Sequence, residues 1–254
     1  MIPHYKLNTM IDYTNNNSNP EAYSEGTGSA MSMNTFFTNV FAYMAGALTI
    51  TGIVAYVFGN SLSLMSYLIN FQTGGMTILG YIVMFAPLAF SLALGVAFSR
   101  FSTFGLLMFY LLFSTVMGVS LGFIFLIYTT ASIATTFFIT AGTFGAMAIL
   151  GYTTKTDLTK MGSILYMAII GIVIASIVNM FFKSDMFDLI ISGIGVIVFT
   201  GFTAYKMQHL KNIAQGQEHG SEAANKLVLY GAITLYITFV NLFISLLRFF
   251  GDRR

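Results

Sequence analysis

Charged side chains at the edges of long apolar segments are the first candidates for chemistry. Arg100, Asp188, Lys206 and Arg248 each lie within or beside an apolar run. An ionisable group at membrane depth indicates a functional site by default. The alternative is that a long basic side chain extends to the lipid headgroups, and we favour that interpretation for Arg100 and Arg248. For Lys206 two placements stay open, the protein interior and the cytoplasmic solvent, and we favour exposure.

The residue pattern gives no support for enzymatic chemistry. The chain contains no HExxH, GxSxG or Walker sequence, no cysteine, and no paired Asp or Glu inside an apolar segment. Its histidines, His4, His209 and His219, lie in the polar start of the chain and in one polar stretch. We therefore expect no enzymatic activity, no metal site and no cofactor.

The last apolar stretch, Leu227 to Gly251, carries a lone amide at Asn241. An amide without a hydrogen-bond partner in hydrocarbon costs several kcal/mol, so Asn241 is expected to face other helices rather than lipid. The interpretation that we favour is that it holds helices together.

Composition indicates a membrane protein. Of the 254 residues, 56% are hydrophobic and 8% charged, whereas soluble domains carry roughly a quarter charged residues. The net charge of +2 does not indicate a nucleic-acid partner. Apolar runs that are continuous rather than alternating, and that contain Gly, favour packed helices over a barrel. We predict an all-α polytopic membrane protein whose seven apolar segments, each near the ~20 residues of a spanning helix, cover residues 35–59, 78–98, 104–128, 131–151, 162–182, 187–205 and 227–250.

Two parts are expected, a mobile polar tail over residues 1–34 and a transmembrane domain over 35–254. Short links make sequential helices antiparallel neighbours, and the polar stretch from Lys206 to Lys226 is predicted to be a solvent loop. With a cytoplasmic N-terminus, six Lys and Arg residues fall on inner links and only Lys183 on an outer one, as the positive-inside rule requires. Whether the last segment crosses fully or re-enters stays open.

Glycines inside the apolar segments are predicted to permit close helix packing. Gly118 and Gly122 form a GxxxG sequence, and Gly142 with Gly145 is a second closely spaced pair. Small residues let helix backbones approach in membranes, so packing is favoured over any active-site role.

Three stretches together resemble a known family. They are GYTTKTDLTKMGSILYMAIIG (151–171), IGVIVFTGFTAYKMQHLKNI (194–213) and LYITFVNLFISLLRFFG (235–251). In order and spacing they are similar to the bacterial branch of the transmembrane Bax inhibitor motif family. The resemblance implies a seven-helix bundle whose last helix is surrounded by the other six. It also implies a relationship to pH-sensitive calcium leak channels.

The same resemblance exposes a departure from the family pattern. Relatives carry an Asp in a "TAYD"-like run and a second Asp in an "LYLDFINLF"-like run, and this pair senses protons and gates the pore. The matching positions here are Lys206 and Thr238. Arg100 matches the basic residue that pairs with one of those carboxylates in relatives, so Arg100 and Lys206 would be like charges. Calcium binding is therefore not expected.

We hypothesise that Asp157, in the short link at residues 152–161, supplies an anion for these two cations. The functional expectation is a channel or an ion-leak, stress-modulating protein that works by an altered mechanism. The alternative is a non-conducting protein that binds other membrane proteins of quality control or translocation. We expect the lipid bilayer as its surroundings and a bacterial inner-membrane location.

Overall fold

The computed structural model describes residues 32–215 and 220–254. Seven of its helical spans are long and apolar enough to cross a membrane, with α4 and α5 counted as one span. This confirms the predicted all-α polytopic membrane fold. In chain order the elements are α1 (Met33–Gly59), α2 (Leu62–Met65), β1 (Ile69–Asn70), β2 (Gly75–Met76), α3 (Ile78–Arg100), α4 (Thr103–Leu121), α5 (Ile124–Ile127), α6 (Thr130–Thr153), α7 (Thr159–Phe182), α8 (Asp185–Ala214) and α9 (Glu222–Phe250).

Most of the long helices begin at a Ser or Thr cap. The side-chain oxygen of the capping residue accepts a hydrogen bond from the backbone N–H three residues further on, which satisfies one of the free donors of the first turn. This arrangement starts α1, α3, α4, α6, α8 and α9, at Ser32, Thr77, Ser102, Thr129, Ser184 and Ser221 respectively.

The polar stretch 206–226 is more helical than its composition predicts. Helix α8 continues to Ala214 and α9 begins at Glu222, so the predicted loop is wrong over most of its length. Met207, Leu210 and Ala214 are buried. Their spacing of three and four residues places them on one face of α8. Burial of that face outweighs the polar side chains that suggested a loop.

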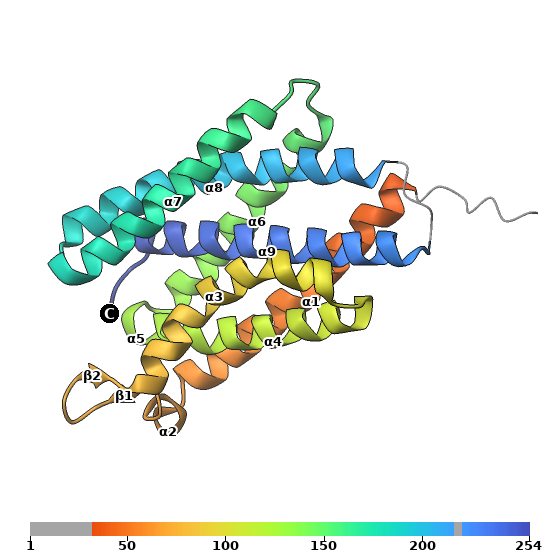
Figure 1. Ribbon diagram of the computed structural model, residues 1–254. Coiled ribbons are helices and arrows are strands. Elements are labelled where there is room, and N and C mark those ends of the chain that lie inside the picture. The colour runs from red at the N-terminus through yellow and green to blue at the C-terminus, as the bar shows by residue number, and fades with distance from the viewer. Residues whose placement is uncertain (1–31, 216–219) are drawn as a thin grey trace, which may run out of the picture.

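Helix α9 forms the centre of the bundle, as Figure 1 shows. It packs against α1, α3, α4, α6 and α8, whereas α7 packs mainly against α8. Side chains from all sides of α9 are buried, including those of Leu235, Tyr236 and Leu242. A helix that is apolar all round and is enclosed by other helices is the expected core of such a bundle. The predicted central position of the last helix is confirmed, but five rather than six spanning helices surround it, because α7 packs on the outer side of α8.

Two glycines set how closely the helices approach. A Cβ atom on Gly118 of α4 would lie 2.8 Å from the carbonyl oxygen of Thr51 in α1, and one on Gly151 of α6 would collide with the backbone of α8. The contact at Gly118 agrees with the predicted packing role of the GxxxG sequence. Gly142 and Gly145 differ, because a Cβ on either would meet no atom within 4 Å. The prediction of close packing at this second pair is wrong, since this face of α6 is uncovered.

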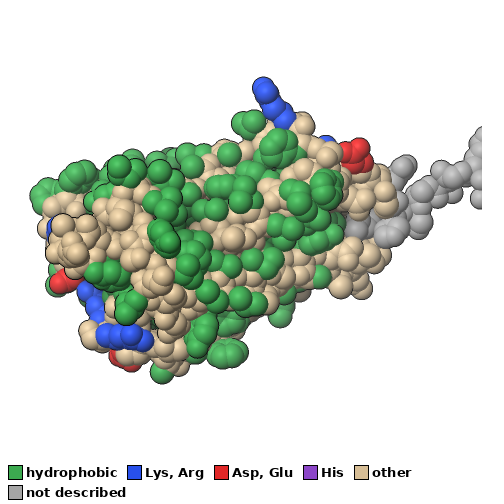
Figure 2. All heavy atoms as spheres, turned by 90° about the horizontal axis from the view of Figure 1, so that it is seen from below, with side chains coloured by type: hydrophobic (Ala, Val, Ile, Leu, Met, Phe, Trp, Pro, Cys, Tyr) green, Lys and Arg blue, Asp and Glu red, His purple; other side chains and the backbone are tan. Residues whose placement is uncertain are grey.

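The bundle has two ends, which we call end A and end B. End A holds the start of α1, the α3–α4 turn and the α6–α7 and α8–α9 links; end B holds the α4–α6 link, the α7–α8 turn and the C-terminus (Figure 1). Because α9 is continuous over residues 222–250, the last segment crosses the bundle fully. Figure 2 shows apolar side chains over the middle of the molecule and charged side chains toward its ends. Of the predicted tail at residues 1–34, only the last three residues are described, and Met33 already begins α1.

Candidate functional site

Lys206 is buried where α8 meets α7. The residue is 5% exposed, its Nζ donates a hydrogen bond to the hydroxyl of Tyr166, and Nζ lies 5.0 Å from the ring centres of both Tyr166 and Phe202. Aromatic faces attract a cation, by about 2 kcal/mol or more when the cation is desolvated. The predicted exposure of Lys206 is therefore wrong. Aromatic side chains of α7 and α8 surround the ammonium group that the sequence suggested would face solvent.

Asp157 does not neutralise this lysine. Among the described residues, no ion pair joins Asp157 to Lys206 or to Arg100. The Asp157 carboxylate is exposed and accepts a hydrogen bond of 2.9 Å from the backbone N–H of Thr159. Hydrogen bonds from Thr159 lower the pKa of Asp157. The hypothesis of pairing fails because this carboxylate accepts from the first backbone N–H of α7, while Arg100 lies exposed at the end of α3.

The link that carries Asp157 is held by a side chain of α8. Gln208 is buried; its amide nitrogen donates to the carbonyl oxygen of Thr156 at 2.8 Å, and its amide oxygen accepts from the backbone N–H of Leu158 at 2.8 Å. Both polar groups of Gln208 are thereby satisfied inside the protein. The Gln208 side chain therefore fixes the α6–α7 link, and Gln208 lies two residues from Lys206 in α8. The sequence pattern did not identify this residue.

Thr238 and Lys206 lie at similar levels along the length of the bundle. Leu210 of α8 packs against Gly231 of α9, and in antiparallel helices this pairing places Lys206 at the level of Leu235. Thr238 is three residues further toward end B, a rise of about 4.5 Å. Thr238 is 1% exposed, and its hydroxyl donates to the carbonyl oxygen of residue 234 at 2.9 Å. The two positions that carry carboxylates in the family pattern thus lie on neighbouring helices within one turn, but the Lys206 ammonium reaches toward α7.

Asn241 is satisfied within its own helix. Its side-chain amide donates to the carbonyl oxygen of Ile237 at 2.8 Å, and its backbone carbonyl accepts from the hydroxyl of Ser245 at 2.8 Å. The prediction that this amide holds helices together is wrong, because a local acceptor one turn away removes the need for an interhelical partner.

The polar link between helices is made instead by Tyr236. Its hydroxyl lies 2.7 Å from Oγ1 of Thr51, and that Oγ1 lies 2.9 Å from the carbonyl oxygen of Ser114. The Thr51 hydroxyl has one proton, which it donates to the carbonyl; Tyr236 must therefore be the donor to Thr51. This chain joins α9, α1 and α4. Nearby, Tyr110 donates to the carbonyl oxygen of Ala232 at 3.3 Å. The sequence shows that Tyr236 and Thr51 are polar residues inside apolar segments, but it does not show that they bond to each other.

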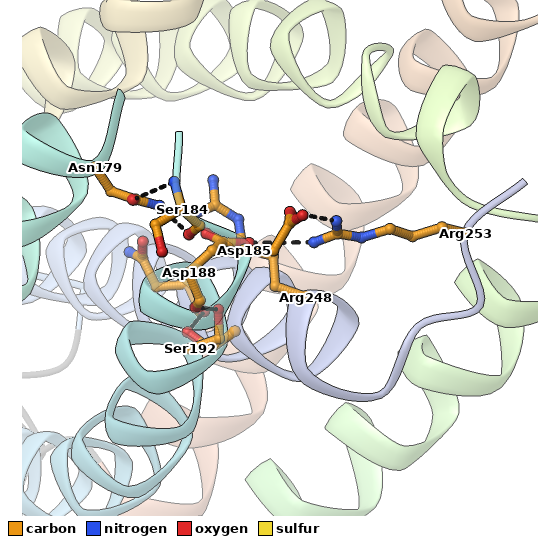
Figure 3. Close-up of polar contacts among 9 residues, drawn as sticks. Asn179, Ser184, Asp185, Asp188, Ser192, Arg248 and Arg253 are labelled. Atoms are coloured by element: carbon orange, nitrogen blue, oxygen red, sulfur yellow. Dashed lines mark hydrogen bonds and ion pairs between the residues drawn. The ribbon is translucent and has the colours of Figure 1, made fainter. Parts of the chain in front are cut away.

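End B carries an ionic cluster, drawn in Figure 3. Arg248 lies 3.4 Å from Asp188, and Arg253 lies 3.1 Å from Asp185 and 3.4 Å from Asp188. The hydrogen bond that Arg253 donates to the Asp185 carboxylate raises the pKa of Arg253. Arg248 was predicted to extend to the lipid headgroups, but it forms an ion pair with Asp188 instead. The reason is that the turn into α8 brings carboxylates beside the end of α9.

The C-terminal residues also run along the α4–α6 link. The backbone N–H of Thr129 donates to the carbonyl oxygen of Asp252 at 3.1 Å, and the backbone N–H of Arg254 donates to that of Ile127 at 2.9 Å. The side chain of Ser132 accepts from the N–H of Asp252 at 2.9 Å. Ion pairs thereby hold the C-terminal residues to the start of α8, and backbone hydrogen bonds hold them to the α4–α6 link.

In the part of the chain that the structure describes, no three His, Cys, Asp or Glu residues gather where they could hold a metal ion. His209 stacks on Tyr205 with ring centres 5.9 Å apart. His4 and His219 lie outside the described residues.

A seven-helix membrane bundle around a buried C-terminal helix, with a buried lysine on α8 and a buried threonine on α9, defines the class. The family model described as "Inhibitor of apoptosis-promoting Bax1" matches residues 33–254. The chain belongs to this Bax inhibitor-like family, which confirms the resemblance found in the sequence.

Bacterial relatives match nearly the whole chain. The inner membrane protein YbhL of Escherichia coli strain K12 is 42% identical over 223 residues, covering 87% of this chain and 93% of YbhL. The protein RP147 of Rickettsia prowazekii is 40% identical over 252 residues, covering 96% of this chain and all of RP147. A protein of Borreliella burgdorferi is 40% identical over 221 residues, covering 87% of this chain and 93% of that protein.

Proposed function

We propose that this chain is a Bax inhibitor-like channel or ion-leak protein of the bacterial inner membrane, with its N-terminus in the cytoplasm, and that it does not conduct calcium by a paired-carboxylate mechanism. The observation that carries the proposal is the buried ammonium of Lys206, at a position where the family pattern has a carboxylate. YbhL is an inner membrane protein, which supports the location. The proposal includes no enzymatic activity.

Electrostatics at the site argue against a calcium ion. Ca²⁺ takes 6–8 oxygen ligands, commonly with carboxylates among them. Here the hydroxyl of Thr238 donates to the backbone of its own helix, and Lys206 brings a positive charge that repels a cation more strongly in a low-dielectric interior than in water. Rings of basic side chains select against cations in channels. Any permeant ion would therefore be of another kind.

Calcium flux into liposomes tests the proposal. We expect the wild-type protein, reconstituted with a calcium dye inside the vesicles, to give no flux above empty vesicles at any pH. The double variant Lys206→Asp with Thr238→Asp restores the carboxylate pair and should create a leak that changes with pH. The single variants Lys206→Asp and Thr238→Asp are the controls, because each supplies only one carboxylate of the pair and neither should create the leak. A pH-dependent calcium flux through the wild type would overturn the proposal.

The alternative, a non-conducting protein that binds other membrane proteins, is favoured by the packing of α7. This helix packs mainly against α8 and leaves apolar side chains such as Met167 and Ile170 exposed, at 64% and 59%. A photoreactive amino acid at Met167, compared with one at Ile197 of α8, tests whether a protein partner contacts α7. Cross-links to one protein from position 167 alone would support the alternative; equal labelling of lipid at both positions would count against it.

A further inference from the structure

The link between α1 and α3, residues 60–77, is a folded segment at end B. It runs through α2 and the β1–β2 hairpin, which lie beside the start of α3 at the edge of the bundle (Figure 1). The two strands are antiparallel. Asn70 holds their turn, because its side-chain oxygen accepts hydrogen bonds from the backbone N–H groups of Gln72 and Thr73 at 2.9 and 3.3 Å. The link is therefore an ordered structure that can hold side chains in fixed positions.

This link is fastened to the first turn of α3. The hydroxyl of Thr77 donates to the carbonyl oxygen of Tyr67 at 2.6 Å. Met65 and Leu68 are buried against the bundle. A Cβ atom on Gly80 would collide with the carbonyl oxygen of Leu68, so the backbone of the link lies directly against α3. Because α3 spans the membrane, the level of the link relative to the bilayer is fixed as well.

Large apolar and aromatic side chains of the link nevertheless point away from the protein. Leu62, Tyr67 and Phe71 are 73%, 65% and 52% exposed. Exposed apolar side chains that lie close together mark a contact surface. They continue the exposed apolar surface of the two spanning helices that the link joins, which consists at this end of Ile53, Val57, Ile78 and Ile82. Lipid covers that surface on both sides of the link.

The link also lacks charge. No Asp, Glu, Lys or Arg occurs between Glu25 and Arg100, whereas soluble domains carry roughly a quarter charged residues. The other long polar stretch, residues 206–226, carries charges of both signs, and the α7–α8 turn at end B carries Lys183 and Asp185. The composition of the α1–α3 link therefore differs from that of the connections that extend into water.

Three exposed tyrosines mark the level of the link. Tyr56 lies in the last turn of α1, Tyr67 in the link and Tyr81 in the first turn of α3. Tyrosine is enriched at membrane–water interfaces, where its ring packs among the acyl chains and its hydroxyl reaches the headgroups. The link thus begins and ends at the level of the headgroups.

We propose that the α1–α3 link is a membrane-interface segment, which rests in the bilayer leaflet at end B with Leu62, Tyr67 and Phe71 at the boundary between headgroups and acyl chains. Its partner is phospholipid. Apolar side chains of an interfacial element reach about 5–10 Å into this boundary. Gln72 and Thr73, which are polar, uncharged and exposed, lie among the headgroups. This placement is independent of whether the protein conducts ions.

Depth-dependent quenching of a fluorescent label tests the placement. The chain has no cysteine, so Leu62→Cys and Phe71→Cys each supply a single thiol for the label. Lys155→Cys, exposed in the α6–α7 link, is the control for water, and Leu92→Cys, exposed near the middle of α3, is the control for the acyl chains. Each labelled protein is placed in lipid nanodiscs that contain spin-labelled phospholipid.

The two variants of the link should be quenched several-fold more strongly by phospholipid that carries its spin label near the ester than by phospholipid labelled deep in the chain. Leu92→Cys should show the reverse preference, and Lys155→Cys should respond only to a quencher dissolved in water. If the two variants behave as Lys155→Cys does, the link lies in water. If they behave as Leu92→Cys does, it lies in the hydrocarbon, and either result overturns the proposal.

Cross-linking in intact cell membranes separates phospholipid from a protein partner. A photoreactive phenylalanine analogue in place of Phe71 keeps an aromatic ring at that position and should form adducts with phospholipid. The same analogue in place of Lys155 should form none. An adduct of position 71 with one protein, and not with phospholipid, would show that the surface binds a protein partner and would refute the lipid assignment.

Discussion

The hydrogen-bonded chain from Tyr236 through Thr51 to Ser114 predicts unequal effects of two substitutions. Tyr236→Phe removes one donor and leaves Thr51 donating to the carbonyl oxygen of Ser114. Thr51→Val removes both the acceptor of Tyr236 and the donor to Ser114. It therefore leaves a buried tyrosine hydroxyl, on a residue 0% exposed, without its partner. Thr51→Val should be the more damaging change, although valine has nearly the same shape.

The magnitudes follow from measured hydrogen-bond energies. Tyr236→Phe should lower the free energy of unfolding by about 1 kcal/mol, the net value of one hydrogen bond, and Thr51→Val by roughly 1–3 kcal/mol, the cost of an unsatisfied buried group. The double variant should be less damaging than the sum. Its coupling energy is expected to be about 0.6 kcal/mol and at most about 1.7 kcal/mol, as for hydrogen bonds between transmembrane helices.

Equilibrium unfolding in mixed micelles, followed by circular dichroism while the denaturing detergent is increased, measures all four proteins of the cycle. Thr115→Val serves as a control for removing a threonine hydroxyl that makes no interhelical bond, and should have little effect. A larger loss for Tyr236→Phe than for Thr51→Val, or no coupling between them, would refute the assignment of Tyr236 as the donor.

Three further predictions concern other parts of the molecule. Gly151→Val should destabilise the bundle strongly, because its side chain collides with the backbone of α8, whereas Gly142→Val should be tolerated; thermal unfolding in detergent distinguishes them, and equal midpoints would contradict the packing argument. Arg253→Gln should lower stability by less than about 1 kcal/mol, since the ion pairs are partly exposed, and the difference from wild type should shrink in high salt. The lowered pKa of Asp157 means that its carboxylate stabilises the start of α7 above its unfolded pKa of about 3.9 and loses this effect as pH falls through the lower folded value. The protection factor of the Thr159 amide, which is its exchange rate relative to the intrinsic rate at the same pH, should therefore fall in acid for the wild type, while Asp157→Asn should lack this pH dependence.

The architecture could be predicted from the sequence because it depends on local composition. A membrane interior requires every backbone group to be bonded within its own segment, so continuous apolar runs of sufficient length become helices. The long helices α1, α3 and α9 accordingly cover the predicted segments closely. The central place of α9 came from resemblance rather than from composition, and the packing confirms it.

Partners of polar groups could not be predicted, because they depend on which faces of distant segments meet. Asn241 was expected to need another helix, yet Ile237 of its own helix supplies the acceptor, while Tyr236 makes the interhelical bond. Asp157 was the sequence's candidate counter-ion, but the turn into α7 uses its carboxylate. The sequence identified which residues carry polar atoms; tertiary packing decided which atoms satisfy them.

Lys206 shows most clearly the difference between what the sequence determines and what the tertiary structure decides. The sequence by itself determined that Lys206 and Thr238 are a lysine and a threonine, and the resemblance implies that these are the positions of the carboxylate pair in the family pattern. Only the tertiary structure decided that this lysine is buried, since its surroundings come from Tyr166 of α7, forty residues earlier in the chain, together with Phe202 of its own helix. Burial depends on contacts across the bundle, and no local pattern encodes them.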